Sequence, residues 1–81
     1  MKDLYLEIVS PEKVLFGDKI SLVEVPGARG RFTVLTGHAP IISALTNGVI
    51  RVQLPNGQEM SFECSRGYLE CSSNKVSILL N

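Results

Sequence analysis

The sequence is poor in several features that mark large classes of proteins. It has no tryptophan, one histidine and two cysteines in 81 residues, and no hydrophobic run approaches the roughly 18 residues of a membrane-spanning helix. Its eight basic and eight acidic side chains cancel, without a run of one sign. Because binding to nucleic acid or anionic lipid depends on clustered basic residues, we expect neither as a direct partner. The acidic residues in "MKDLYLEIVS" also argue against a secretory signal peptide.

The two cysteines, Cys64 and Cys71, are too few to build a disulfide scaffold, and both occupy inward positions of expected strands. We therefore expect two buried free thiols. Together with His38 they would offer at most three zinc ligands, and their C-x6-C spacing lacks the short separation of metal-binding cysteines. The sequence thus predicts no metal and no other cofactor.

Hydrophobic residues recur with a period of two, and glycine, proline and asparagine fall between the repeats. In "DLYLEIV", the leucines and the isoleucine share one face of a strand. The next strand is expected to break at Gly17-Asp18 and to resume until a turn at Pro26-Gly27. No segment has the pattern of a long helix. We therefore expect an all-β chain, a single domain over residues 1–81 with about 8 to 10 short strands in a two-sheet β-sandwich or flattened barrel.

The register of two hairpins follows from the rule that cross-strand partners share a face. A three-residue loop at Pro55–Gly57 keeps the hydrophobic residues of both strands on one side, whereas a two-residue turn would not. In the last hairpin, a two-residue turn at Ser73–Asn74 achieves the same result. The expected pairs are Val52 with Met60, Ile50 with Phe62, Cys71 with Val76, and Leu69 with Ile78.

His38, in "TVLTGHAPI", is the only histidine and so the first candidate for catalysis. No G-x-S-x-G nucleophile motif accompanies it, and we expect neither a catalytic residue nor enzyme activity. Two interpretations remain open. His38 is either a turn residue, since Gly37 permits a bend and the Ala39-Pro40 step forces extended geometry, or a contact for a partner.

Arg29 and Arg31 lie among glycines in "GARGRF", which precedes a strand and not a helix, so a phosphate-binding loop is not expected. They are either solubilising charges or a contact point for acidic or carbonyl-bearing surfaces. A free-standing carrier or ligand-binding β-sandwich is the alternative function. However, the lysines of the strands and turns, Lys13, Lys19 and Lys75, lack the short motif of lipoyl and biotinyl domains.

Four segments carry a resemblance that covers essentially the whole chain. They are "LEIVSPEKVLF" (residues 6–16), "VPGARGRFTVLTGHAP" (25–40), "LTNGVIRV" (45–52) and "GYLECSSNKVSIL" (67–79). In this order they resemble the N-terminal domain of the epsilon subunit of bacterial F-type ATP synthase. The glycine-rich turn followed by G-H-A-P is specific in the company of the flanking segments.

The resemblance implies a non-catalytic β-sandwich in the central stalk of the rotor, bound to the gamma subunit and touching the c-ring. Such a subunit helps couple ion-driven rotation to ATP synthesis, at the cytoplasmic face of the bacterial inner membrane, and forms no homo-oligomer. Carried over by position, the loop Gly27, Ala28, Arg29, Gly30 and Arg31 would face the c-ring. Ser10 and the turn Gly37, His38, Ala39 and Pro40 would lie toward gamma. A permanent partner face should also leave an exposed apolar patch on the isolated domain.

The sequence departs from the family pattern in four places. The family commonly has an acidic residue at the position of Arg31, a glycine at Thr33 and a proline at Thr36. The reversed charge at Arg31 would oppose a basic ring loop unless that loop differs too. Typical members also continue into a C-terminal helical hairpin, whereas this sequence ends at Asn81. We therefore expect a coupling subunit without the inhibitory helices.

Overall fold

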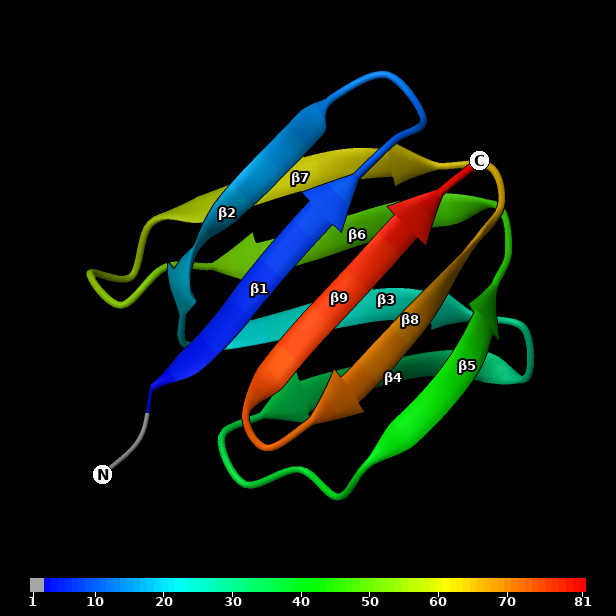
Figure 1. Cartoon of the computed structure of the whole chain (residues 1–81). Helices are drawn as coiled ribbons and strands as arrows, with labels where there is room; N and C mark the ends of the chain where they lie inside the picture. The colour runs from blue at the N-terminus through cyan, green and yellow to red at the C-terminus, as the bar shows by residue number, and fades with distance from the viewer. Residues whose placement is uncertain (1–2) are drawn as a thin grey trace.

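The computed structural model describes residues 3–81, and that part of the chain contains nine strands (Figure 1). In chain order they are β1 (Leu4–Val9), β2 (Val14–Ile20), β3 (Leu22–Gly27), β4 (Gly30–Leu35), β5 (Ile41–Leu45), β6 (Gly48–Gln53), β7 (Glu59–Cys64), β8 (Gly67–Ser72) and β9 (Lys75–Leu80). The all-β class expected from the period-two pattern is confirmed.

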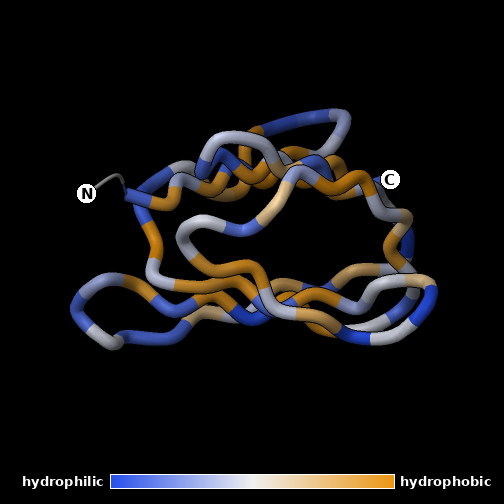
Figure 2. Tube along the Cα trace, turned by 90° about the horizontal axis from the view of Figure 1, so that it is seen from below, coloured by the Kyte–Doolittle hydropathy of each residue, from blue (hydrophilic) through white to orange (hydrophobic). Residues whose placement is uncertain are grey.

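The strands form two layers that face each other (Figure 2). The first sheet has the order β2-β1-β9-β8-β5, and the second has the order β4-β3-β6-β7. The layers join at one corner, where Gly27 of β3 pairs with Leu45 of β5. All neighbours are antiparallel except β1 and β9, which run parallel in the middle of the first sheet. The two-sheet sandwich predicted from the sequence is therefore confirmed.

The core lies between the sheets and is built from alternate residues of nearly every strand. Because side chains of a strand alternate between its two faces, each strand contributes a few aliphatic residues to one side. No polar or charged side chain is buried within residues 3–81. The buried side chains are Leu4, Leu6, Ile8, Ile20, Val23, Val25, Val34, Leu45, Ile50, Val52, Cys64, Leu69, Cys71, Val76 and Ile78.

The break expected at Gly17-Asp18 is wrong. β2 runs through both residues, which pair with Glu7 and Leu6 of β1. Glycine is tolerated there because β2 is an edge strand. The interruption comes instead at Ser21, where the chain crosses from the first sheet to the second and the Ser21 amide donates to the Gln53 carbonyl at 2.8 Å.

The turn expected at Pro26-Gly27 is also displaced. Both residues belong to β3 and pair with Arg31 and Gly30, so that the turn itself consists of Ala28 and Arg29. Proline fits within this strand because the pairing of β3 with β6 extends only from Leu22 to Glu24, and the missing amide hydrogen at Pro26 therefore costs no ladder bond on that side.

Both expected hairpin registers are confirmed. Val52 pairs with Met60 across the loop at Pro55–Gly57, and Gly57 has the positive φ of 90° that this loop requires. Leu69 pairs with Ile78 across the tight turn at Ser73–Asn74. Ser73 and Asn74 have φ values of 52° and 63°, which is the left-handed conformation of a type I′ turn.

Candidate functional site

The β3–β4 turn is held rigidly against the end of β5. The Ala28 amide donates to the Ala44 carbonyl at 2.9 Å, and the Thr46 amide donates to the Pro26 carbonyl at 2.8 Å. Together with the pairing of Gly27 and Leu45, these bonds connect the turn to both sheets. The turn therefore presents its side chains from a fixed backbone and not from a mobile loop.

Gly27 is required by close packing at the base of this turn. A Cβ atom at this position would lie 2.7 Å from the Gly30 carbonyl oxygen and 2.8 Å from the Phe32 ring. Neither neighbour can withdraw without opening the hairpin, since one is backbone and the other packs against the core. The shape of the turn thus depends on glycine at this residue.

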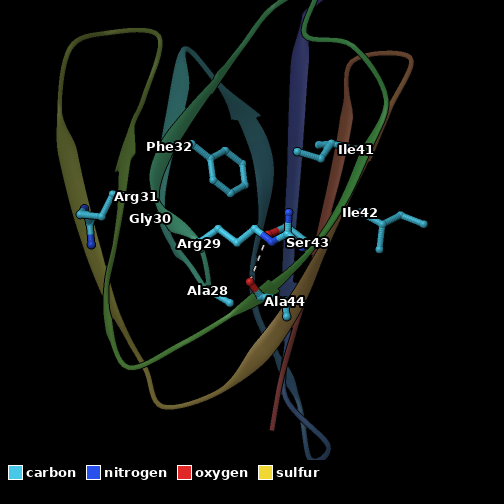
Figure 3. Close-up of a pocket in the computed structure, with 10 residues that line it drawn as sticks. Ala28, Arg29, Gly30, Arg31, Phe32, Ile41, Ile42, Ser43 and Ala44 are labelled. Carbon is cyan, nitrogen blue, oxygen red and sulfur yellow. Dashed lines mark hydrogen bonds between the residues drawn. The ribbon is translucent and has the colours of Figure 1, made fainter.

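Arg29 of the turn and Arg31 of β4 point in opposite directions (Figure 3). Arg31 lies over the second sheet, where its Nη2 donates to the Val49 carbonyl at 2.8 Å and its Nε lies 3.4 Å from Glu24 Oε2. Arg29 extends toward β5 on the other side and has no hydrogen bond or ion pair within residues 3–81. The loop expected to face one partner therefore carries one engaged charge and one free charge.

A groove of about 660 Å³ separates the β3–β4 turn from β5. Arg29 lines one side, and Phe32, Ile41, Ile42 and Ser43 line the rest. No carboxylate lies among the lining residues, whose charged members are Arg29 and Arg31. The groove is consequently a partly apolar channel with a positive potential.

The outer face of the first sheet carries an exposed apolar patch. Ile42, Tyr68 and Leu79 are 77%, 61% and 56% exposed, and they lie on the adjacent strands β5, β8 and β9. We call these three residues the apolar patch. They border a second groove of about 430 Å³ whose rim includes Glu7 and Glu70. The exposed patch expected from the sequence is present.

The outer face of the second sheet is different in character. Its exposed positions are mostly charged or hydroxyl-bearing, and its groove is lined only by Glu24, Arg31, Val49 and Arg51. Glu59, Ser61 and Glu63 face outward from β7, as the predicted register requires. Interface cores are depleted in charge, so the first sheet provides the better surface for a permanent partner.

The Gly37–Pro40 segment is a tight turn followed by extended chain. The His38 amide donates to the Leu35 carbonyl at 3.0 Å, and Gly37 has a φ of 85°, as the third residue of a type II turn requires. His38 Nδ1 lies 2.7 Å from the Ala39 carbonyl oxygen. The histidine is thus engaged with its own turn.

Asn74 connects this turn to the β8–β9 hairpin, since its Oδ1 accepts a hydrogen bond of 2.7 Å from the Gly37 amide. We expect Asn74→Gly to lower the free energy of unfolding by about 1 kcal/mol through loss of this bond. Asn74→Ala should cost about 2 kcal/mol, because alanine also disfavours the left-handed backbone. Urea unfolding of both variants measures the difference, and equal losses would contradict the role of the backbone conformation.

Ser10 lies at the opposite end of the first sheet from the Gly37–Pro40 turn. It follows the last residue of β1, and its amide donates to the Lys13 carbonyl at 2.9 Å. The first residues of β1 instead lie beside Asn74, which accepts from the Tyr5 amide through its carbonyl at 2.9 Å. A strand of six residues spans about 20 Å, so the structure does not bring Ser10 and His38 together (Figure 1).

Residues 3–81 contain no group of three or more histidine, cysteine, aspartate or glutamate side chains placed to hold a metal ion. Burial raises the pKa of the thiols of Cys64 and Cys71, which disfavours the reactive thiolate, and both cysteines are free as expected. Residues 3–81 contain no helix that is long and apolar enough to cross a membrane.

Comparison with known proteins gives a consistent result. Residues 3–81 match the family described as the ATP synthase delta/epsilon chain, beta-sandwich domain. The chain is 41% identical over 78 residues to the ATP synthase epsilon chain of Chlorobaculum tepidum, covering 96% of this chain and 89% of that one. It is 36% identical over 81 residues to the epsilon chain of Campylobacter fetus, covering all of this chain and 63% of the relative.

Two solved structures share the fold. One is the Euglena gracilis mitochondrial ATP synthase, OSCP/F1/c-ring in rotational state 1, with a TM-score of 0.91 and 18% identity over 96% of this chain and 50% of the other. The second is the central stalk and c-ring of the Tetrahymena thermophila mitochondrial ATP synthase, with a TM-score of 0.79 and 13% identity over 98% of this chain and 63% of the other. At these identities the likeness concerns the fold alone.

Proposed function

Because the chain belongs to the family of ATP synthase delta/epsilon chain β-sandwich domains, we propose that it acts as a non-catalytic subunit in the rotor stalk of an F-type ATP synthase. In this role it binds the gamma subunit, contacts the c-ring and helps couple ion-driven rotation to ATP synthesis. The observation that carries the proposal, beyond family membership, is the cluster of exposed apolar side chains on the outer face of the first sheet, in contrast to a second sheet whose outer face is mostly charged or hydroxyl-bearing.

The apolar patch is the proposed docking surface for gamma. More than half of the surface of each patch residue, Ile42, Tyr68 and Leu79, is exposed to solvent. The three residues lie on three adjacent strands, so their exposed apolar surfaces are close together. Covering them removes hydrophobic area from water, which is the main favourable term in stable association. Glu7 and Glu70 at the rim favour a partner segment that combines apolar residues with basic ones.

The β3–β4 turn is the proposed contact with the c-ring. Ile42 borders both the groove beside Arg29 and the groove beside Tyr68, so the two surfaces meet along edge strand β5. A subunit placed with its apolar patch on gamma would therefore hold the turn next to gamma and free to reach a second partner. Single-face attachment and a rigid adjacent turn suit a link between stalk and ring.

The domain belongs to the F1 sector, peripheral to the membrane, as the epsilon chains it resembles do. We propose the cytoplasmic face of the bacterial inner membrane as its location. The proposal is supported by the bacterial origin of the relatives and by the exposed charge of the second sheet, which suits contact with water.

Reconstitution tests the proposed function. The purified chain is mixed with the gamma subunit of the same organism, and with the catalytic head and ring-containing vesicles from which the chain has been removed. We expect a one-to-one complex with gamma in size-exclusion chromatography, and recovery of ion-coupled ATP synthesis after addition of the chain. No complex with gamma and no recovery of coupling would refute the proposal. The purified chain alone should show no ATP hydrolysis, because the proposed subunit is not catalytic.

A further inference from the structure

The geometry of the β3–β4 turn points to a partner chemistry that the family resemblance does not supply. We propose that the turn recognises a carboxylate on a loop of the c-ring through Arg29, with Arg31 taking no part in that contact. This inference rests on the proposed function, because it specifies the chemistry of one of its two interfaces.

The two arginines differ in the contacts that they make within the domain. The guanidinium of Arg31 is occupied by the Val49 carbonyl at 2.8 Å and by Glu24 at 3.4 Å, and it lies over the second sheet. Turning it toward the groove would break both contacts. Arg29 has no such contacts within residues 3–81 and is exposed. Of the two positive charges, Arg29 is therefore the one that can pair with a partner without giving up a contact of its own.

The groove beside Arg29 has an unbalanced charge. Its lining includes no carboxylate, and apart from Arg29 and Arg31 the lining residues are apolar or hydroxyl-bearing. The Ser43 hydroxyl already donates to the Ala44 carbonyl at 3.0 Å, as the dashed line in Figure 3 marks. The positive potential is therefore uncompensated. A carboxylate is the complementary group, since the planar guanidinium can pair with both of its oxygens.

The backbone that carries Arg29 is held on both sides. The Ala28 amide is bonded to the Ala44 carbonyl on one side of the turn, and Gly27 closes it against Phe32 on the other. Arg29 therefore projects from a backbone whose position is fixed relative to β5. A fixed backbone reduces the conformational entropy lost on binding. One charge pair can then help to fix the relative position of the two partners as well as contribute to affinity.

The groove suits a loop and not a flat surface. It is about 660 Å³ in volume, and the turn side is open at Gly30, where a Cβ atom would meet nothing within 4 Å. Phe32 and Ile41, at its inner wall, are partly buried and pack against the core. An acidic side chain on a short loop can thus reach Arg29 while neighbouring apolar atoms of that loop contact the wall.

The test compares binding to gamma alone with binding to the complete rotor of gamma and c-ring from the same organism. The variants are Arg29→Gln, Arg29→Glu and, as the matched control two residues away, Arg31→Gln. For the wild type, the rotor should bind more tightly than gamma alone, and added salt should reduce that excess. We expect Arg29→Gln to lower the ratio of rotor affinity to gamma affinity about tenfold, and Arg29→Glu to lower it further. The affinity for gamma alone should stay unchanged.

Arg31→Gln should leave the ratio of the two affinities unchanged. A charge swap gives the strongest support: an acidic ring-loop residue changed to arginine should restore the binding of Arg29→Glu but not that of wild type. The inference is overturned if Arg29→Gln keeps the full excess, if Arg31→Gln loses as much, or if the loss occurs with gamma alone. A wild-type chain that binds neither gamma nor the rotor would refute the proposed function instead.

Discussion

Replacing Leu69 with alanine is expected to lower the free energy of unfolding by about 3 kcal/mol. Leu69 lies in the middle of β8, is 0% exposed and pairs with Ile78 across the sheet. Removal of its side chain leaves a cavity between the sheets that the neighbouring core residues fill only in part, because β8 is itself held by ladder bonds to β9 and β5. Small domains have about 5 to 15 kcal/mol of stability in total, so the loss is a large fraction.

Leu79→Ala is the matched control for that experiment. Leu79 is a leucine of the neighbouring strand on the opposite face of the same sheet, and it is 56% exposed. Its replacement should cost about 0.5 kcal/mol or less. Urea unfolding, monitored by circular dichroism, measures the stability of both variants. The m value, which is the slope of the unfolding free energy against urea concentration, should equal that of the wild type. Equal losses for the two leucines would contradict the assignment of the core to the inner face.

Introducing charge into the apolar patch should weaken binding to gamma about 100-fold or more. In the double variant Ile42→Glu with Tyr68→Glu, two carboxylates replace the exposed side chains and would be buried without partners in the complex. Glu7 and Glu70 at the rim add like-charge repulsion. Both substituted positions face solvent in the isolated domain, so its stability should change little. Isothermal titration calorimetry with gamma measures the effect.

Val49→Glu provides the comparison on the other face. Val49 is a partly exposed aliphatic residue of β6 on the outer face of the second sheet, 39% exposed and beside Arg31 and Arg51. Its change to glutamate should leave affinity for gamma within about twofold of wild type. If Val49→Glu abolishes binding while the double variant of the patch does not, the second sheet is the docking face.

Local pattern was sufficient to predict most of the individual strands. The alternation of leucine and isoleucine from Leu4 to Ile8 describes a strand with one buried face, and the same reasoning set both hairpin registers correctly. It failed at Gly17-Asp18, where glycine and aspartate stand in an edge strand without breaking it. Edge position depends on which strands are neighbours, and a local pattern carries no such information.

The surface features depended on tertiary structure in a similar way. Arg31 looked equivalent to Arg29 in the sequence, and only the pairing of β3 with β6 brings Val49 within its reach. The apolar patch could have been noticed, since Tyr68 and Leu79 occupy outward positions of the register predicted for the last hairpin. Their meeting with Ile42 could not, because it requires β5 to lie beside β8.

The roles expected for Ser10 and for the Gly37–Pro40 turn stay predictions. The positions of the two segments limit which interfaces could include both. The two segments lie at opposite ends of the first sheet, about 20 Å apart by strand length. An interface that includes both must therefore extend along the whole sheet, across the apolar patch. An interface confined to one end would include only one of them.

The parallel pairing of β1 with β9 has a consequence for how the chain folds. Tyr5 and Lys75 are cross-strand neighbours although 70 positions separate them (75 minus 5). The local hairpins β1–β2 and β8–β9 can form early, but the first sheet closes only when they meet, which is a slow, long-range step. During synthesis that step waits until β9 has left the ribosome. Two strands of the apolar patch, β8 and β9, are the last two strands of the sandwich along the chain, so the patch is complete only after the rest of the sandwich has been made.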